Sequence, residues 1–251
     1  MTPDRIGLQY RLLPVETPDG VTLNGWLLPG KPPVKGTIVF LHGNAQNISY
    51  HIASVYWLPA AHYNVYLYDY RGFGSSGGKA TLENSIQDFS SVMKGLQKII
   101  PHAEQHYIVF GQSLGAAIAI AAVARFKAQF PIQLLVADSA FSGFRRIAKE
   151  KLKEILFTRP FAGLLAHAFP AEPDLLQCVA KLTPIPVLLI HGEQDRIVPF
   201  QHSRQLFWAA REPKQLWLEP GAGHIMSLTH KPLRRRFLKY LDKVMMQGVT
   251  R

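Results

Sequence analysis

The chain has 251 residues, of which 47% are hydrophobic and 18% are charged. This balance excludes a disordered or fibrous protein, and the length suffices for one domain, residues 1–251, around a large core. The net charge of +11 suits nucleic acid, an anionic membrane or an acidic substrate, but no nucleic-acid motif occurs. We therefore expect no nucleic-acid partner. The single cysteine, Cys178, has no partner for a disulfide.

The first elements predict an antiparallel hairpin at the edge of a sheet. Residues 15–28 alternate in polarity around the turn sequence Thr17-Pro18-Asp19-Gly20, which should send half of their side chains to solvent. From residue 37 the strands become short continuous apolar runs, typical of a parallel sheet that is buried on both faces. These runs are residues 37–41, 65–68, 107–110, 134–137, 187–190 and 215–218.

Helical patterns alternate with these strands. A stripe of apolar residues from Leu82 to Ile100 at spacings of four and three predicts an amphipathic helix with Thr81 as its cap. Residues 116–126 and 233–245 predict two more helices. The order indicates an α/β fold, a mostly parallel twisted sheet with helices on both faces. The irregular interval 141–186, after the sixth strand, is the candidate lid.

One serine has the local setting of a nucleophile. Gly111-Gln112-Ser113-Leu114-Gly115 follows the strand at 107–110 and opens the apolar helix at residue 116. In a GxSxG elbow the glycines leave room for the neighbouring chain, and the serine is presented above the sheet. The pentapeptide also arises by chance in plain structural turns. In this strand-turn-helix context we interpret Ser113 as the nucleophile.

A serine nucleophile needs a general base, and His224 is the best placed of ten histidines. It lies in a glycine-rich loop between the last strand and the last helix, on the sheet edge that carries the elbow. His42 and His191 also end strands, but each stands in a His-Gly pair where a buried or turn-forming imidazole is the commoner use. The remaining seven have no partner motif.

The orienting carboxylate should follow another strand at the same edge. Asp195 does so, and the chain order serine, aspartate, histidine is typical of one hydrolase superfamily. Asp138 is the rival acid and Asp69 a more distant one. We expect Asp138 to hold a neighbouring loop by hydrogen bonds instead. Glu193 lies too close to its strand end for this role.

Acyl transfer also needs donors for the oxyanion. The backbone N–H of Leu114 is one expected donor, and that of Asn44, after the strand that ends at residue 41, is the second.

These motifs, together with Asp69-Tyr70-Arg71-Gly72-Phe73-Gly74-Ser75-Ser76-Gly77, resemble the α/β-hydrolase superfamily, and more narrowly the ABHD-type depalmitoylases and their bacterial relatives. The resemblance implies esterase, thioesterase or lipase-like activity without a cofactor, on a small acyl ester or thioester. Members of that branch commonly carry a membrane anchor ahead of the first strands. The given sequence has no run of 18 or more apolar residues and no secretory signal at its start, so we expect a cytoplasmic protein. It would be associated with a membrane if an anchor precedes the given sequence.

Other functions are open at this stage. An oligopeptidase-like hydrolase shares the catalytic core but usually carries an extra gating domain, and a binding protein could keep the fold without activity. A metal enzyme is disfavoured because no HExxH motif or cluster of histidines and carboxylates occurs. Nicotinamide and ATP enzymes are disfavoured because no GxGxxG or P-loop follows a strand. We expect no cofactor and no metal.

The candidate lid carries a basic amphipathic helix. Its apolar residues from Phe144 to Ile155 fall at helical spacing, with lysines and arginines around them. One interpretation is ordinary packing on the sheet with a solvated charged face. The other is that Phe157, Phe161, Leu164 and Leu165 line an apolar channel to Ser113, while the basic face approaches an anionic membrane.

Overall fold

The computed structural model describes residues 2–248, so residue 1 and residues 249–251 of the predicted domain lie outside the described residues. Eight strands form the main sheet in the order β1-β4-β6-β5-β7-β8-β9-β10. The strands are β1 (Arg11–Leu12), β2 (Val15–Glu16), β3 (Thr22–Leu23), β4 (Gly25–Leu28), β5 (Gly36–Leu41), β6 (Tyr63–Tyr68), β7 (Tyr107–Gln112), β8 (Ile132–Asp138), β9 (Val187–Gly192) and β10 (Lys214–Glu219). The helices are α1 (Ile48–His51), α2 (Leu82–Ile99), α3 (Leu114–Phe126), α4 (Phe144–Glu154), α5 (Ala162–Leu165), α6 (Leu175–Ala180), α7 (Gln201–Ala209) and α8 (Lys231–Gly248).

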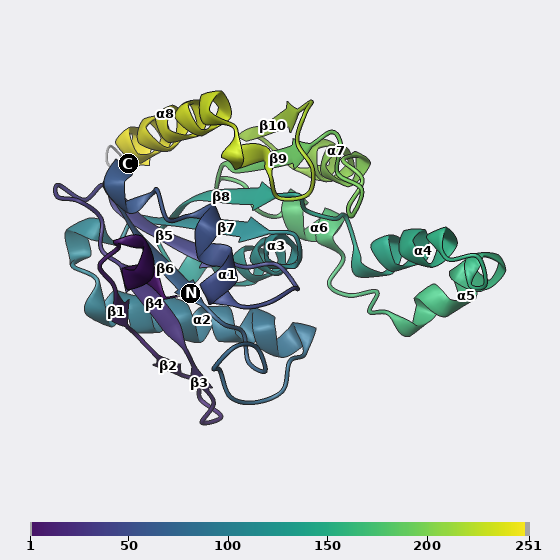
Figure 1. Ribbon diagram of the computed structural model, residues 1–251, viewed down its shortest axis with the longest axis horizontal. Helices are drawn as coiled ribbons and strands as arrows, with labels where there is room; N and C mark the ends of the chain where they lie inside the picture. The colour runs from purple at the N-terminus through teal and green to yellow at the C-terminus, as the bar shows by residue number, and fades with distance from the viewer. Residues whose placement is uncertain (1, 249–251) are drawn as a thin grey trace.

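The predicted parallel sheet is confirmed. Strands β5 to β10 run parallel to one another, and every residue of β5, β6, β7 and β9 is buried. Helices cover both faces (Figure 1). Helices α2, α3, α6 and α7 pack into one hydrophobic core, while α1 and α8 pack into the other. Burial on two faces explains why these strands are continuous apolar runs rather than alternating ones.

The N-terminal hairpin differs from its prediction. The turn at residues 17–20 joins β2 and β3, but these strands form a separate two-stranded sheet. It is β4 that enters the main sheet, antiparallel to β6, and all four of its residues are buried. Leu27 packs into one core, and Trp26 and Leu28 pack into the other. The expected solvent-facing half of this strand is therefore wrong for β4, because elements of the fold cover both of its faces.

The segment between β8 and β9 has two parts. Its second part, α6, packs against α3 and α7 and buries Leu175 and Val179. Its first part, with α4 and α5, projects from the body at the edge where β8 ends (Figure 1). We call the projecting residues 144–169 the lid lobe. Within residues 2–248, no helix combines the length and the apolar character needed to cross a membrane.

Candidate active site

Ser113 lies in a sharp turn between β7 and α3. Its backbone has φ 53° and ψ −115°, a left-handed region that non-glycine residues rarely adopt. A Cβ on Gly111 would overlap backbone atoms of Gly115 and Ala116, and a Cβ on Gly115 would overlap the carbonyl oxygen of Leu41. Both glycines of the predicted elbow are thus required by close backbone packing. The turn places Ser113 at the carboxyl edge of the sheet.

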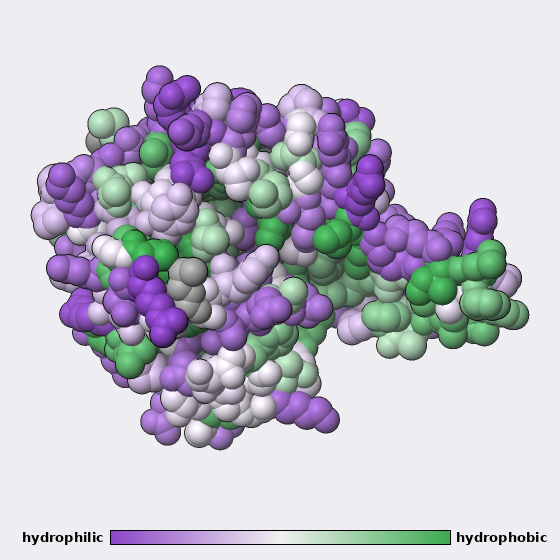
Figure 2. All heavy atoms as spheres, viewed as in Figure 1, coloured by the Kyte–Doolittle hydropathy of each residue, from purple (hydrophilic) through white to green (hydrophobic). Residues whose placement is uncertain are grey.

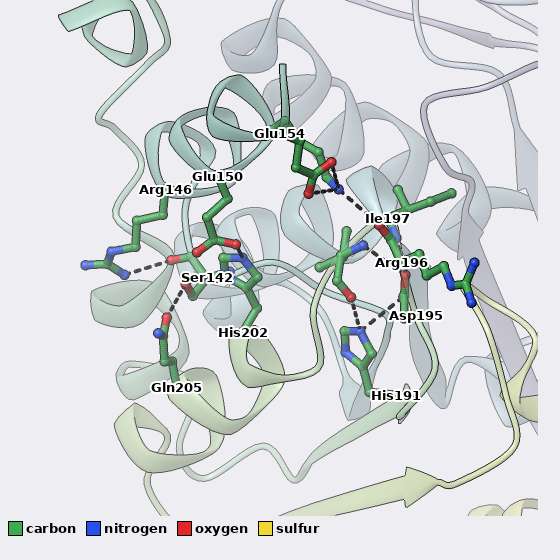
Figure 3. A network of polar contacts seen from close by, with 12 residues as sticks. Ser142, Arg146, Glu150, Glu154, His191, Asp195, Arg196, Ile197, His202 and Gln205 are labelled. Carbon is green, nitrogen blue, oxygen red and sulfur yellow. Dashed lines mark hydrogen bonds and ion pairs between the residues drawn. The ribbon is translucent and has the colours of Figure 1, made fainter. Parts of the chain in front are cut away.

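Asp195 and His224 come together at the same edge, as the sequence predicts. His224 Nδ1 lies 2.7 Å from Asp195 Oδ2, and the carboxylate is fully buried while the imidazole is 14% exposed. The backbone N–H groups of Ile197 and Val198 donate to Asp195 Oδ1 at 2.8 and 2.9 Å. His191 Nε2 lies 3.1 Å from Asp195 Oδ2 (Figure 3). Four groups therefore fix the carboxylate that faces His224.

The electrostatics of Asp195 follow from these contacts. Burial alone would raise the pKa of Asp195, but hydrogen bonds from His191, His224 and the Val198 N–H outweigh it and hold the pKa well below its usual range. The carboxylate is therefore charged at neutral pH and can accept a proton-sharing hydrogen bond from His224.

Asp138, the rival acid, has a different set of partners. It is completely buried at the end of β8, where it accepts from Gln112 Nε2 at 2.9 Å and from the Ser139 hydroxyl at 3.2 Å. Burial raises its pKa despite these bonds. Ser139 also accepts the Ile225 N–H at 3.0 Å, and the Asp138 carbonyl accepts the Ser113 N–H at 2.9 Å. Asp138 thus supports the elbow through Gln112 and the Ser113 N–H, and the His224 loop through Ser139, without a hydrogen bond to His224 itself.

The loop after β5 lies against the elbow. A Cβ on Gly43 would lie 3.7 Å from the Cβ of Ser113, so the backbone that leads into Asn44 passes close to the serine. Leu114 is the first residue of α3, and its N–H has no acceptor within the helix. Asn44 and Leu114, the two predicted oxyanion donors, therefore flank Ser113 on neighbouring elements.

The loop after β6 supports the loop after β5. Asp69 accepts the Ile48 N–H at 2.9 Å at the start of α1, and the Tyr70 hydroxyl donates to the His42 carbonyl at 2.9 Å. Gly74 has φ 51°, and a Cβ there would overlap the Asp69 carboxylate. The glycine-rich turn that begins at Asp69 therefore positions the Asp69 and Tyr70 side chains against the loop after β5.

An apolar cavity of about 740 Å³ opens beside these loops. A cavity of this size is typical of a site for a small organic ligand. No aspartate or glutamate of the described chain contributes to its lining, and Arg234 is at its wall. Residues on its wall include His51, Ile52, Tyr56, Gln112, Ile225 and Met226.

The residues predicted to form a substrate channel lie elsewhere. Phe161 and Leu165 are 59% and 41% exposed on the lid lobe, and neither lines this cavity. The lobe is held at its base, where Ser142 and Glu150 both contact His202, at 2.8 and 2.9 Å (Figure 3). From this base the chain extends outward rather than back over the sheet edge (Figure 1).

Comparisons with known proteins identify the family. Residues 32–171, more than half of the chain, match the family described as serine aminopeptidase, S33. The chain belongs to this family of α/β hydrolases. It is 35% identical over 212 residues to an Escherichia coli (strain K12) protein described as the uncharacterized protein YfhR, covering 82% of this chain and 70% of that one. The predicted resemblance is confirmed.

A eukaryotic relative and a solved structure agree with this assignment. Alpha/beta hydrolase domain-containing protein 17B of Xenopus laevis is 30% identical over 195 residues, which cover 77% of this chain and 62% of that protein. The structure of the Pyrococcus furiosus esterase Pf2001 superposes with a TM-score of 0.79 at 24% identity, covering 98% of this chain and 96% of that one. The latter similarity confirms the α/β-hydrolase fold.

Two histidines of this α/β hydrolase reach the site although the sequence analysis gave neither of them a role there. His51 Nε2 lies 2.8 Å from the Ala45 carbonyl, on the loop that follows Asn44, and the imidazole also lines the cavity. His191 contacts the buried Asp195 carboxylate. The sequence offered no signal for His51, whereas His191, in a His-Gly pair at a strand end, was expected to be a buried or turn-forming imidazole, and it is buried.

The pH dependence of stability should reveal the buried histidines. Desolvation lowers the pKa of His42 to about 4, so the folded hydrolase keeps this imidazole neutral while the unfolded chain protonates it below its ordinary pKa of 6.5. Desolvation also lowers the pKa values of His51 and His202, with the same sign. Between pH ~6.5 and ~4 the unfolded state binds more protons than the folded state. The free energy of unfolding is therefore unaffected by these histidines above pH ~6.5 and falls as the pH approaches ~4.

We expect the free energy of unfolding to be lower at pH 5 than at pH 7 by about 2 kcal/mol from His42 alone. Denaturant titrations at about pH 7, 6 and 5 measure this difference in unfolding free energy. The His42→Gln variant should show a shallower slope over this range. An unfolding free energy that stays constant or rises on acidification would contradict the buried neutral imidazole.

Within the described residues, histidine, cysteine and carboxylate side chains form no group of three or more that could hold a metal ion. The polar groups at the carboxyl edge of the sheet are instead paired with one another, as Asp195 is with His224. This arrangement suits proton transfer between an imidazole and a hydroxyl.

Proposed function

We propose that this α/β hydrolase cleaves carboxylic esters or thioesters through an acyl-enzyme, with Ser113 as nucleophile, His224 as general base and Asp195 as orienting carboxylate. The observation that carries the proposal is the 2.7 Å contact between His224 Nδ1 and a buried, charged Asp195, at the sheet edge where a strained turn presents Ser113. Because Asp195 accepts from Nδ1–H, the Nε2 of His224 is left free to accept a proton.

The proposed reaction has two halves. His224 Nε2 takes the proton of the Ser113 hydroxyl as its oxygen attacks the carbonyl carbon, and the oxyanion accepts hydrogen bonds from the N–H groups of Asn44 and Leu114. The tetrahedral intermediate then expels the alkoxide or thiolate, which takes the proton from His224. Water attacks the acyl-enzyme with the same proton transfers, releasing the acid and restoring Ser113.

The family description offers an aminopeptidase as a second candidate. Recognition of a free α-amino group needs a carboxylate near the reacting carbonyl. The cavity, whose wall includes Gln112 next to Ser113, is lined by apolar and uncharged polar side chains, His51 and Arg234, with no acidic side chain from the described residues. An uncharged or anionic ester fits this lining better than an ammonium group does.

A panel of p-nitrophenyl esters tests the proposal. Burying one methylene contributes about 0.8 kcal/mol, so kcat/KM should rise several-fold for each two carbons from acetyl through octanoyl until the cavity is full. Ala53 is an exposed residue on the cavity wall, and Ala53→Trp should reduce the activity on octanoyl more than on acetyl esters.

Leu165→Ala is the matched control, because Leu165 does not line the cavity, and its chain-length profile should equal that of the wild type. If Leu165→Ala or Phe161→Ala flattened the profile while Ala53→Trp did not, the lid lobe would be the acyl site. Faster turnover of aminoacyl p-nitroanilides than of any ester would favour the aminopeptidase.

A further inference from the structure

The outer end of the lid lobe exposes a cluster of large apolar side chains. Its members are Leu156, Phe157, Phe161, Leu164 and Leu165, which we call the lid tip, and their exposed fractions are 74, 87, 59, 73 and 41%. Figure 2 shows them as a continuous apolar patch at the end of the projection. A contiguous patch of this kind on a soluble protein marks a surface that contacts something apolar.

Positive charge accompanies this patch. The lid lobe, residues 144–169, contains six basic and two acidic residues. Both acids are already paired, Glu150 with His202 at 2.9 Å and Glu154 with Lys151 at 2.8 Å. The exposed lysines Lys149 and Lys153 have no carboxylate partner within the described part of the chain. The lobe therefore presents apolar side chains and unpaired cations together.

We propose that the lid tip inserts into the surface of an anionic lipid bilayer while Lys149, Lys153 and Arg159 contact the lipid headgroups. Apolar side chains flanked by lysine and arginine are the composition that binds such an interface. A second copy of the chain fits less well, because a symmetric contact through two lid tips would bring two lobes of the same charge together.

The position of the lid lobe determines which edge of the sheet would face a bound bilayer. It leaves the body at the end of β8, the carboxyl edge of the sheet that also carries Ser113 and Asp195 (Figure 1). A bilayer held by the lid tip would therefore face the edge on which the site lies. The binding step itself does not depend on the proposed hydrolysis.

Vesicle flotation tests the proposal with the full chain. We expect wild-type protein to float with phosphatidylcholine vesicles that contain phosphatidylglycerol, more weakly with pure phosphatidylcholine, and more weakly at high salt. The double variant Phe157→Ser/Leu164→Ser should lower the partition coefficient at least about tenfold. Lys149→Gln/Lys153→Gln should lower it on the order of fivefold for each lysine and reduce its salt dependence.

Matched controls lie on other elements. Leu12 on β1 is 70% exposed, close to the 73% of Leu164, so Leu12→Ser tests the loss of one exposed leucine. Lys94→Gln/Lys98→Gln on α2 removes two exposed lysines at the same spacing as the lid pair. Both controls, and Ser113→Ala, should bind vesicles as the wild type does. Vesicle binding by Ser113→Ala separates this proposal from the catalytic one.

Three results would overturn the proposal. The first is equal binding to anionic and uncharged vesicles, and the second is lid-tip or lysine variants that bind as well as their controls. The third is the absence of vesicle binding together with a dimer in solution that Phe157→Ser/Leu164→Ser abolishes, which would make a second copy the occupant of the lid tip.

Discussion

Ser113→Ala should lower kcat on any accepted ester by about 10⁵-fold or more, and should abolish labelling by a fluorophosphonate probe. Only the hydroxyl group is removed, and Ser113 is half-buried in a turn rather than packed into the hydrophobic core. The free energy of unfolding should therefore stay within about 1 kcal/mol of the wild-type value. Single-turnover assays, probe labelling and denaturant unfolding measure the three quantities.

A second serine provides the control for this variant. Ser139 directly follows the adjacent strand β8 and has the same φ of 53°, but its hydroxyl donates to Asp138 and accepts from the Ile225 N–H. Ser139→Ala should therefore cost stability and some activity while labelling by the probe persists. If Ser113→Ala were still labelled and Ser139→Ala were not, the nucleophile would have been assigned to the wrong strand end.

The strand pattern allowed most of the sheet to be predicted because burial on two faces leaves a simple signature. Strands β5 to β9 appear as buried apolar runs, whereas in the edge strand β10 only Trp217 is buried, so the expected burial on both faces is wrong there. In a parallel sheet the loops that follow the strands meet at one edge. That rule alone brings Asp195 and His224 together from positions 29 residues apart. Gly111 is required by backbone of the elbow itself, at Gly115 and Ala116, whereas Gly115 is required by the Leu41 carbonyl at the end of the neighbouring strand β5.

Other features depend on packing that no local pattern encodes. His51 stands on the one-turn helix α1, and its contact with the Ala45 carbonyl arises from a tight loop whose path the sequence does not specify. The burial of β4 depends on separate elements that cover each face. For the lid lobe, helical spacing identifies an apolar stripe, but it does not indicate whether that stripe faces Ser113 or solvent.

Replacing Asp195 and Asp138 one at a time separates orientation of the base from support of the fold. Asp195→Asn should lower kcat on the order of 10⁴-fold with little effect on KM. An amide at this position can still accept the N–H groups of Ile197 and Val198 through its oxygen. Its NH₂ group then faces His224 Nδ1 and donates to it, which leaves the proton on Nε2.

In that tautomer His224 cannot take a proton from Ser113, and no carboxylate stabilises the imidazolium that forms. Asp138→Asn has the opposite chemistry, because burial already raises the pKa of Asp138 and its partners are Gln112 and Ser139. A neutral amide of the same shape disturbs those bonds but leaves His224 untouched, so the loss should fall mainly on the free energy of unfolding. Measurements of kcat and of the free energy of unfolding for both variants decide the assignment. A loss of kcat on the order of 10⁴-fold in Asp138→Asn, with Asp195→Asn still active, would transfer the orienting role to Asp138.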